Sequence, residues 1–176
     1  MRRYVAALVV MWVLPGAMAE AQAPAAAGSS RPDILQIDGS KNPELVPQWS
    51  VWGFVFRVIA GGPRQLPSSV LRVASKEDEA LVMKEADGIQ KVDADCQARL
   101  TKVVALIGVE SIDVVDGRVR EITVACRRET LQARDRLLAG LNPEAAAALM
   151  AFAESTKAGT STSLPKKDLA RFLEPE

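Results

Sequence analysis

Residues 75–140 decide the fold of this chain: SKEDEALVMKEADGIQKVDADCQARLTKVVALIGVESIDVVDGRVREITVACRRETLQARDRLLAG. Apolar residues recur along both halves in steps of four and three, the spacing of one face of an α-helix. The stripe runs from Val82 to Ile107 in the first half and from Val115 to Leu137 in the second. Gly108 and Ser111 lie between them, so the stretch predicts two long helices that fold back on each other.

Both predicted helices carry recognisable starts. Ser75 precedes three acids, an arrangement that caps free N–H groups and complements the helix dipole. Ser111 is the candidate cap of the second helix, which we expect to end at Gly140. Residues 112–115 also suit a short β-like passage, and this alternative stays open.

The two cysteines connect the predicted helices. Cys96 and Cys126 lie on the apolar stripes, and their midpoint is residue 111, at the predicted turn. In an antiparallel hairpin, residues equidistant from the turn face each other, so we predict a Cys96–Cys126 disulfide. Closing a loop of about thirty residues would contribute roughly 3–4 kcal/mol in chain-entropy models. The alternative is a pair of buried thiols.

The rest of the chain predicts shorter helices. Pro47 would clash inside a helix, so we expect a single turn at residues 43–46 and a helix over residues 47–60. A short turn is expected near Ser68, and Asn142 followed by Pro143 predicts a last helix to about residue 158. Residues 160–163 are expected to be a loop. The predicted fold class is all-α, an antiparallel helical bundle of four to five helices with one disulfide-linked hairpin.

The helix over residues 47–60 is rich in aromatic side chains. Trp49, Trp52 and Phe56 share one face, and this chain has only 3 Trp and 4 Phe. Aromatic rings bury large areas, so we interpret the three as the centre of the core. The functional alternative is that they form an apolar surface for a peptide, a lipid or a second subunit.

The first residues have the layout of a secretory signal peptide. Arg2 and Arg3 precede an apolar run of about eleven residues, shorter than the roughly 20 that span a bilayer. We expect cleavage after Ala19, with Ala23 or an uncleaved anchor as alternatives. Residues 1–19 are then the signal peptide, residues 20–36 a flexible leader and residues 37–176 the helical domain. The expected location is outside the cytoplasm, periplasmic or extracellular, in a bacterium.

Composition excludes several chemistries. The chain has 22 basic and 22 acidic residues, and removing Arg2 and Arg3 leaves 20 against 22, so nucleic acid is not an expected partner. It has no histidine, which excludes histidine-dependent nucleophilic and zinc sites. No phosphate loop or dinucleotide motif occurs, and no cofactor or metal is expected. Asp93, the one charge on an apolar stripe, is expected to pair with Arg127 or Arg128, with a functional carboxylate as the alternative.

Two segments carry a resemblance. IDGSKNPELVPQW (37–49) and ARDRLLAGLNPEAAAALMAFAE (133–154) resemble a group of uncharacterised secreted helical bacterial proteins. The LNPE segment is also similar to a helix start in periplasmic chaperones of the heavy-metal-resistance type. Neither resemblance implies a catalytic residue, a substrate or a cofactor.

These observations predict an exported, non-enzymatic helical protein that acts by binding a protein or an apolar ligand, without stable membrane insertion after signal cleavage. The surface expected to bind is the aromatic helix from Trp49 to Phe56. One alternative is an enzyme that uses carboxylates. Another is a membrane-tethered, chaperone-like periplasmic helical protein.

Overall fold

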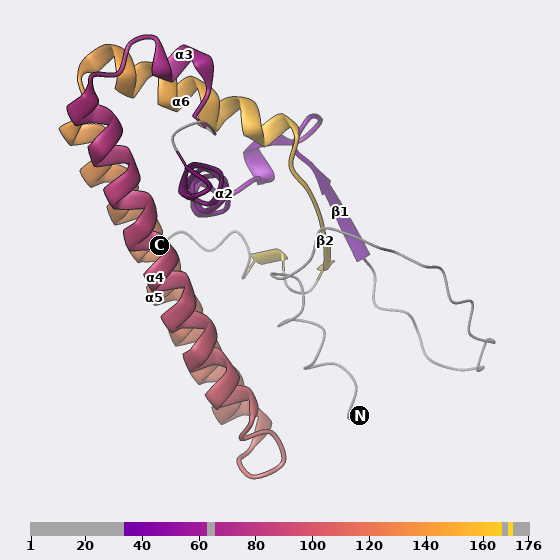
Figure 1. Cartoon of the computed structure of the whole chain (residues 1–176). Helices are drawn as coiled ribbons and strands as arrows, with labels where there is room; N and C mark the ends of the chain where they lie inside the picture. Colours follow the sequence, from indigo (N-terminus) through magenta and orange to yellow (C-terminus); the bar gives the residue numbers. More distant parts are fainter. Residues whose placement is uncertain (1–33, 63–65, 167–168, 171–176) are drawn as a thin grey trace. The chain divides into compact units, whose positions relative to one another are not determined.

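In the computed structural model, the residues described are 34–62, 66–166 and 169–170. Five α-helices, one 3-10 turn and a small two-stranded sheet follow one another along this part of the chain (Figure 1). The all-α class and the antiparallel helical hairpin are confirmed. The elements are β1 (Ile34–Asp38), η1 (Pro43–Leu45), α2 (Gln48–Ala60), α3 (Ser68–Leu71), α4 (Lys76–Val104), α5 (Ile112–Gly140), α6 (Pro143–Ala158) and β2 (Ser161–Pro165).

The hairpin of α4 and α5 is the longest feature of the fold. Each helix has 29 residues, or about 43 Å at 1.5 Å per residue. The turn between them lies where the sequence predicted it, with Gly108 at φ +93°, a conformation that favours glycine. Ile112 begins α5, so the β-like alternative at residues 112–115 is wrong.

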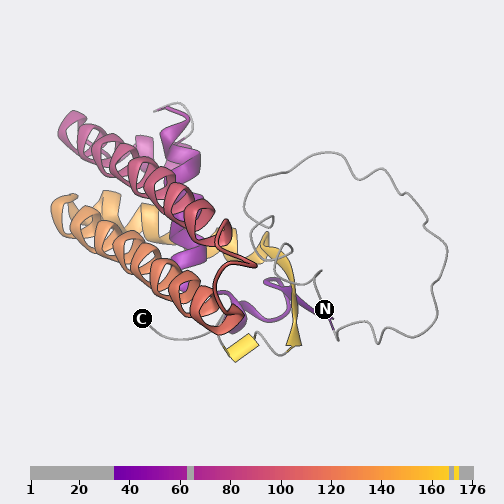
Figure 2. The ribbon, with the colours of Figure 1, turned by 90° about the horizontal axis from the view of Figure 1, so that it is seen from below.

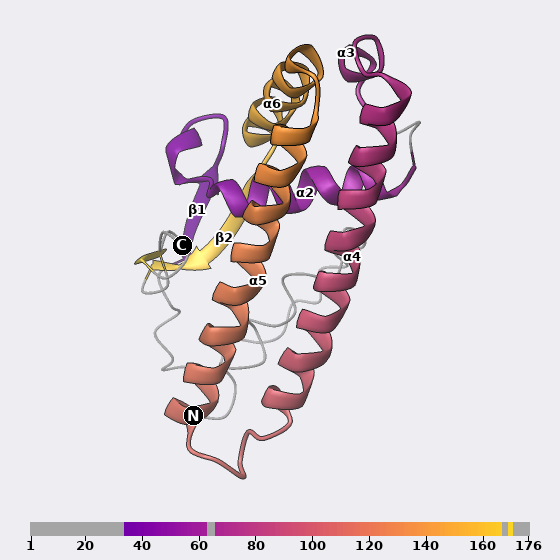
Figure 3. The same ribbon diagram turned by 90° about the vertical axis from the view of Figure 1, so that its left-hand side faces the viewer.

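The core lies where α2 crosses the upper part of the hairpin (Figure 3). α2 packs against α4, α5 and α6, so most of its circumference is covered. This is why its sequence is apolar on nearly every side. Large buried side chains of this cluster are Trp52, Phe56 and Ile59 of α2, Val82 and Ile89 of α4, Leu137 of α5 and Leu149 of α6.

A cluster of hydrogen bonds joins the start of α4 to the start of α6. The Ser75 hydroxyl accepts a hydrogen bond from the Asp78 N–H at 3.1 Å, and the Asp78 carboxylate accepts one from the Ser75 N–H at 2.8 Å. Asp78 also accepts from the Asn142 N–H at 3.0 Å. Asn142 in turn caps α6 by accepting from the Ala145 N–H at 2.9 Å. The predicted caps Ser75 and Asn142 are therefore confirmed.

The small sheet corrects two boundaries of the sequence analysis. Residues 34–36, assigned to the leader, belong to β1, and residues 161–163, assigned to a loop, belong to β2. The strands pair antiparallel, with Gln36 opposite Ser163. Ile37 is fully buried in the core, which ties the sheet to the helices. The predicted signal peptide, residues 1–19, and the leader up to residue 33 lie outside the described residues.

The corner after β1 requires a glycine. A Cβ built on Gly39 would lie 1.8 Å from the backbone oxygen of Lys157. The Gly39 N–H donates a hydrogen bond to the Thr160 carbonyl at 2.9 Å. This bond joins the residue that follows β1 to the residue that precedes β2. Among the described residues, none of the helices combines the length and apolar character needed to span a membrane.

Candidate functional site

The aromatic residues of α2 are interior. Trp49, Trp52 and Phe56 are 7%, 0% and 0% exposed, and the rings of Trp52 and Phe56 lie 5.9 Å apart between centroids. The core role is therefore confirmed for Trp52 and Phe56, which belong to the main core cluster, whereas Trp49 is buried outside that cluster. These side chains do not form the apolar binding surface considered as the alternative, because α4, α5 and α6 enclose the helix that carries them.

The predicted disulfide is present. Cys96 of α4 and Cys126 of α5 are bonded, with their Cα atoms 6.4 Å apart. Neither cysteine belongs to the main core cluster, whose last α4 member is Ile89 and whose first α5 member is Ala133. The disulfide thus joins the two helices in the part of the hairpin that lies beyond the core.

This distal part of the hairpin projects away from the other described elements (Figures 1 and 3), and Figure 2 shows α4 and α5 side by side. It comprises residues 97–125, from the disulfide to the turn and back. Between the two helices here, Val115 and Ile122 are buried, so the arm has an apolar seam of its own. We call residues 97–125 the distal arm.

The end of the distal arm carries a concentration of exposed aliphatic side chains. Four of them lie within eight residues of sequence, and we call them the tip patch: Ile107, Val109, Ile112 and Val114, which are 41%, 81%, 50% and 45% exposed. The other large exposed apolar side chains among the described residues are dispersed over β1, α2, α3 and α6, as Ile34, Phe54, Leu71 and Met150.

Backbone hydrogen bonds define the turn that presents the tip patch. The N–H groups of Val109 and Glu110 both donate to the Leu106 carbonyl, at 2.9 and 3.0 Å. The Ile107 N–H donates to the Val104 carbonyl at 3.1 Å. The tip is therefore a hydrogen-bonded turn rather than an open loop, and its apolar side chains are presented by a defined backbone.

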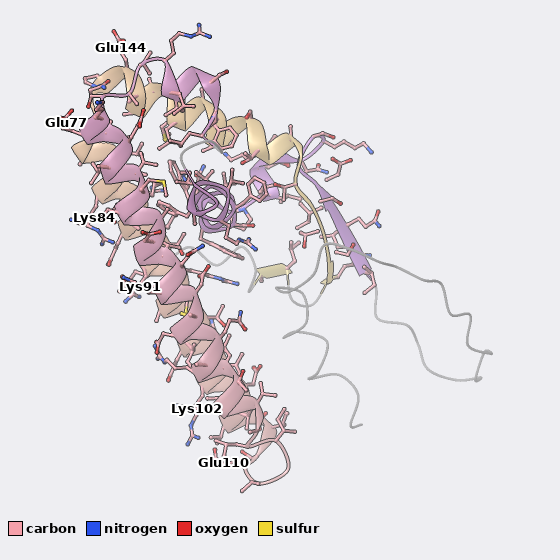
Figure 4. All side chains as sticks on the ribbon, viewed as in Figure 1. Glu77, Lys84, Lys91, Lys102, Glu110 and Glu144 are labelled. Atoms are coloured by element: carbon pink, nitrogen blue, oxygen red, sulfur yellow. A yellow bond between two sulfur atoms is a disulfide. The ribbon has the colours of Figure 1, made fainter. Side chains whose placement is uncertain are left out.

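Charges around the tip patch are balanced. Glu110 forms an ion pair with Arg118 at 2.9 Å between Oε2 and the guanidinium nitrogen. In Figure 4, Glu110 lies at the tip of the hairpin, and Lys102 lies on α4, farther from the tip. Over residues 102–120 three basic and three acidic side chains occur: Lys102, Arg118, Arg120, Glu110, Asp113 and Asp116. The tip therefore has no net formal charge.

Asp93 lies on the core side of the disulfide. Burial raises the pKa of its carboxyl group, and the nearby positive charge of Arg57 on α2 opposes that shift. The sequence predicted Arg127 or Arg128 as the basic partner of Asp93. Instead, the guanidinium carbon of Arg127 lies 4.2 Å from the centroid of the Trp49 ring, a cation–π contact.

The acids that follow Ser75 lie at the start of α4. Glu77 and Asp78 belong to the first turn of α4, and the Asp78 carboxylate accepts a hydrogen bond from the Asn142 N–H. In the part of the chain that the structure describes, no three carboxylate, cysteine or histidine side chains gather in the way that metal ligands do.

The sequence predicted the turn but not the tip patch. Val109, Ile112 and Val114 lie off the two apolar stripes, and that misfit was the signal available. The sequence pattern placed Val109 in the turn, and Ile112 and Val114 either at the start of the second helix or in a short β-like passage. No protein-family model, no curated protein and no solved structure matches the chain.

Proposed function

We propose that this chain is an exported, non-enzymatic binding protein that docks through the tip patch. The observation that carries the proposal is the exposure of four aliphatic side chains at the end of a projecting hairpin. Exposed apolar groups gathered in one place typically mark interaction sites, whereas single ones need no explanation. Phe54, Leu71 and Met150 are of the second kind.

The free energy available from covering the tip patch is moderate. The four exposed fractions together correspond to about two fully exposed aliphatic side chains. Burying one such side chain contributes about 1.5–3 kcal/mol, so covering the patch supplies roughly 3–6 kcal/mol before the cost of association. Docking by this patch alone is therefore reversible.

The distal arm is suited to present such a patch. The Cys96–Cys126 disulfide and the seam at Val115 and Ile122 hold its two helices together beyond the core. A surface that is already ordered loses less conformational freedom when it binds. The disulfide also supports a location outside the reducing cytoplasm, periplasmic or extracellular.

The carboxylate enzyme has weaker support. An acid–base mechanism of that kind needs two acids with separated pKa values in one place. Asp93 is the candidate with a raised pKa, and the charge that acts on it is a guanidinium, Arg57, rather than a second carboxylate. Neither a catalytic role nor a cofactor is part of the proposal.

Photo-crosslinking in expressing cells tests the proposal. A photoreactive amino acid replaces Val109 in one variant and Lys91, an exposed residue on α4, in a matched control. We expect adducts, whether with protein or with lipid, from position 109 and few from position 91. Equal adducts from both positions, or none from position 109, would contradict docking by the tip.

A further inference from the structure

We propose that the partner of the tip patch is the neutral surface of a lipid bilayer. This inference rests on the proposed function, because it names the partner of the same patch. Two other partners are compatible with exposed aliphatic side chains: a second copy of the chain and a groove on another protein. Area, shape and charge together favour lipid over both.

Area disfavours a protein partner. A stable protein interface covers about 800 Å² on each partner. Four partly exposed aliphatic side chains make a patch on the order of a few hundred Å². Two copies meeting tip to tip would therefore cover too little surface. A groove would have to enclose the flanks of the distal arm as well, and those flanks expose polar side chains such as Arg99 and Lys102.

Shape favours a surface that needs no complementary cavity. The patch lies on a turn at the end of a hairpin, with Val109 as its most exposed side chain. A turn of this kind is convex, and a bilayer can accept it without a preformed site. Interfacial segments typically bury their apolar side chains about 5–10 Å deep.

The charged side chains set the depth and the lipid class. Arg118 lies four residues after Val114, about 6 Å along a helix, so its long side chain can reach the headgroups while the aliphatic groups insert. Its ion pair with Glu110 lowers the cost of bringing that acid close to lipid. Asp113, which is exposed beside Ile112 and Val114, keeps insertion shallow.

The balance of three basic and three acidic residues over 102–120 argues against recognition of anionic lipid. Attraction to anionic lipids arises from clusters of lysine and arginine and weakens as salt rises. Binding by the tip patch should therefore occur on zwitterionic phosphatidylcholine and depend little on salt.

Flotation with phosphatidylcholine vesicles tests the inference. The protein is purified in its processed form from expressing cells, with the disulfide intact, and floated at low and at high salt. Two variants are compared with the wild type. Val109→Glu/Ile112→Glu charges the tip patch, and Met150→Glu places the same side chain at an exposed apolar position of α6.

We expect the wild type and Met150→Glu to float equally, with less than about a twofold change between the two salt conditions. The tip variant should lose at least about tenfold in bound fraction. Circular dichroism and the absence of free thiols check that each variant is folded. If the wild type does not float, or the tip variant floats as well as the wild type, the lipid inference is wrong.

The remaining outcomes separate this inference from the proposed function. Protein adducts from position 109 without flotation would overturn the lipid partner and leave docking by the tip intact. A wild-type dimer that Val109→Glu/Ile112→Glu dissociates in sedimentation would overturn it in favour of a second copy. The absence of both adducts and flotation would remove the proposed function itself.

Discussion

At the scale of single residues, Asp78 connects two distant segments of the chain. Its carboxylate accepts hydrogen bonds from the backbone N–H groups of Ser75 and Asn142, which hold its pKa down at about 2. Hydrogen bonds that a carboxylate accepts favour its ionised form. The same group therefore caps α4 and positions the start of α6.

This depressed pKa makes stability depend on pH. The pKa of Asp78 is lower in the folded chain, about 2, than the ordinary value of 3.8 for an aspartate carboxyl group. The stabilisation is therefore complete above pH 4 and is lost as the pH falls from about 4 to about 2. We expect Asp78→Asn to lower the melting temperature at pH 7 by roughly 5–10 °C. Thermal unfolding by circular dichroism measures this.

The difference between Asp78→Asn and the wild type should shrink toward pH 2, where about half of the wild-type carboxylate is protonated. Asp87→Asn, an exposed acid of the same helix, serves as the control and should change the melting temperature little. An equal loss for both variants, or a loss that is independent of pH, would contradict the role assigned to Asp78.

Two glycines should respond in opposite directions to the same substitution. A Cβ on Gly39 meets the Lys157 carbonyl at 1.8 Å, whereas nothing lies within 4 Å of a Cβ on Gly88, which is exposed in the middle of α4. Gly39→Ala should cost about 2 kcal/mol or more, and Gly88→Ala should stabilise the chain by about 0.5–1 kcal/mol. Urea unfolding of both variants checks the pair, and a destabilised Gly88→Ala would count against the helix geometry.

At the scale of elements, the disulfide stabilises an arm that the core does not reach. We expect replacement of both cysteines, Cys96→Ser/Cys126→Ser, to lower the free energy of unfolding by roughly 2–4 kcal/mol. Hydrogen exchange should show where the loss falls. Amides of residues 100–119 should lose protection first, while those of residues 82–89, inside the core cluster, should keep most of it. A uniform loss along the hairpin would show that the arm is not a separate unit.

The hairpin could be predicted from sequence because its signals are local and repeated. The stripe spacing, the turn at Gly108 and the positions of Cys96 and Cys126 are consistent with one another, and each constrains the others. Asn142 could also be predicted as a helix cap, because a proline follows it. These features depend on residues close together in the chain or related by the symmetry of a hairpin.

The strands could not be predicted in the same way. β1 and β2 have five residues each, and their register joins Ile34 to Pro165 across the whole domain. Five residues with one fully buried side chain, Ile37, give too short a pattern to separate from a leader. The contact of Asp78 with Asn142 could not be predicted either, because the two residues are 64 positions apart in the sequence. The tip patch could not be predicted because exposure in a turn leaves no periodic pattern in the sequence.

At the scale of the whole molecule, the described residues fall into a core with α2 at its centre and a distal arm that projects from it (Figure 3). The core holds the buried side chains that stabilise the fold. The distal arm carries exposed aliphatic side chains that lie outside the core cluster. Because the tip patch is small, we expect the purified protein to be monomeric at micromolar concentration. Sedimentation equilibrium measures this, and a dimer would direct attention to a larger surface than the tip.

The claim that binding occurs through the end of the distal arm can be tested by hydrogen exchange with mass spectrometry. The exchange of the purified wild-type protein is compared with and without membrane vesicles prepared from the cells that express it. We predict slowed exchange confined to residues 105–115, and no slowing in Val109→Glu/Ile112→Glu. Unchanged exchange at residues 105–115, or slowing centred on another element such as α6 or β1, would contradict the account.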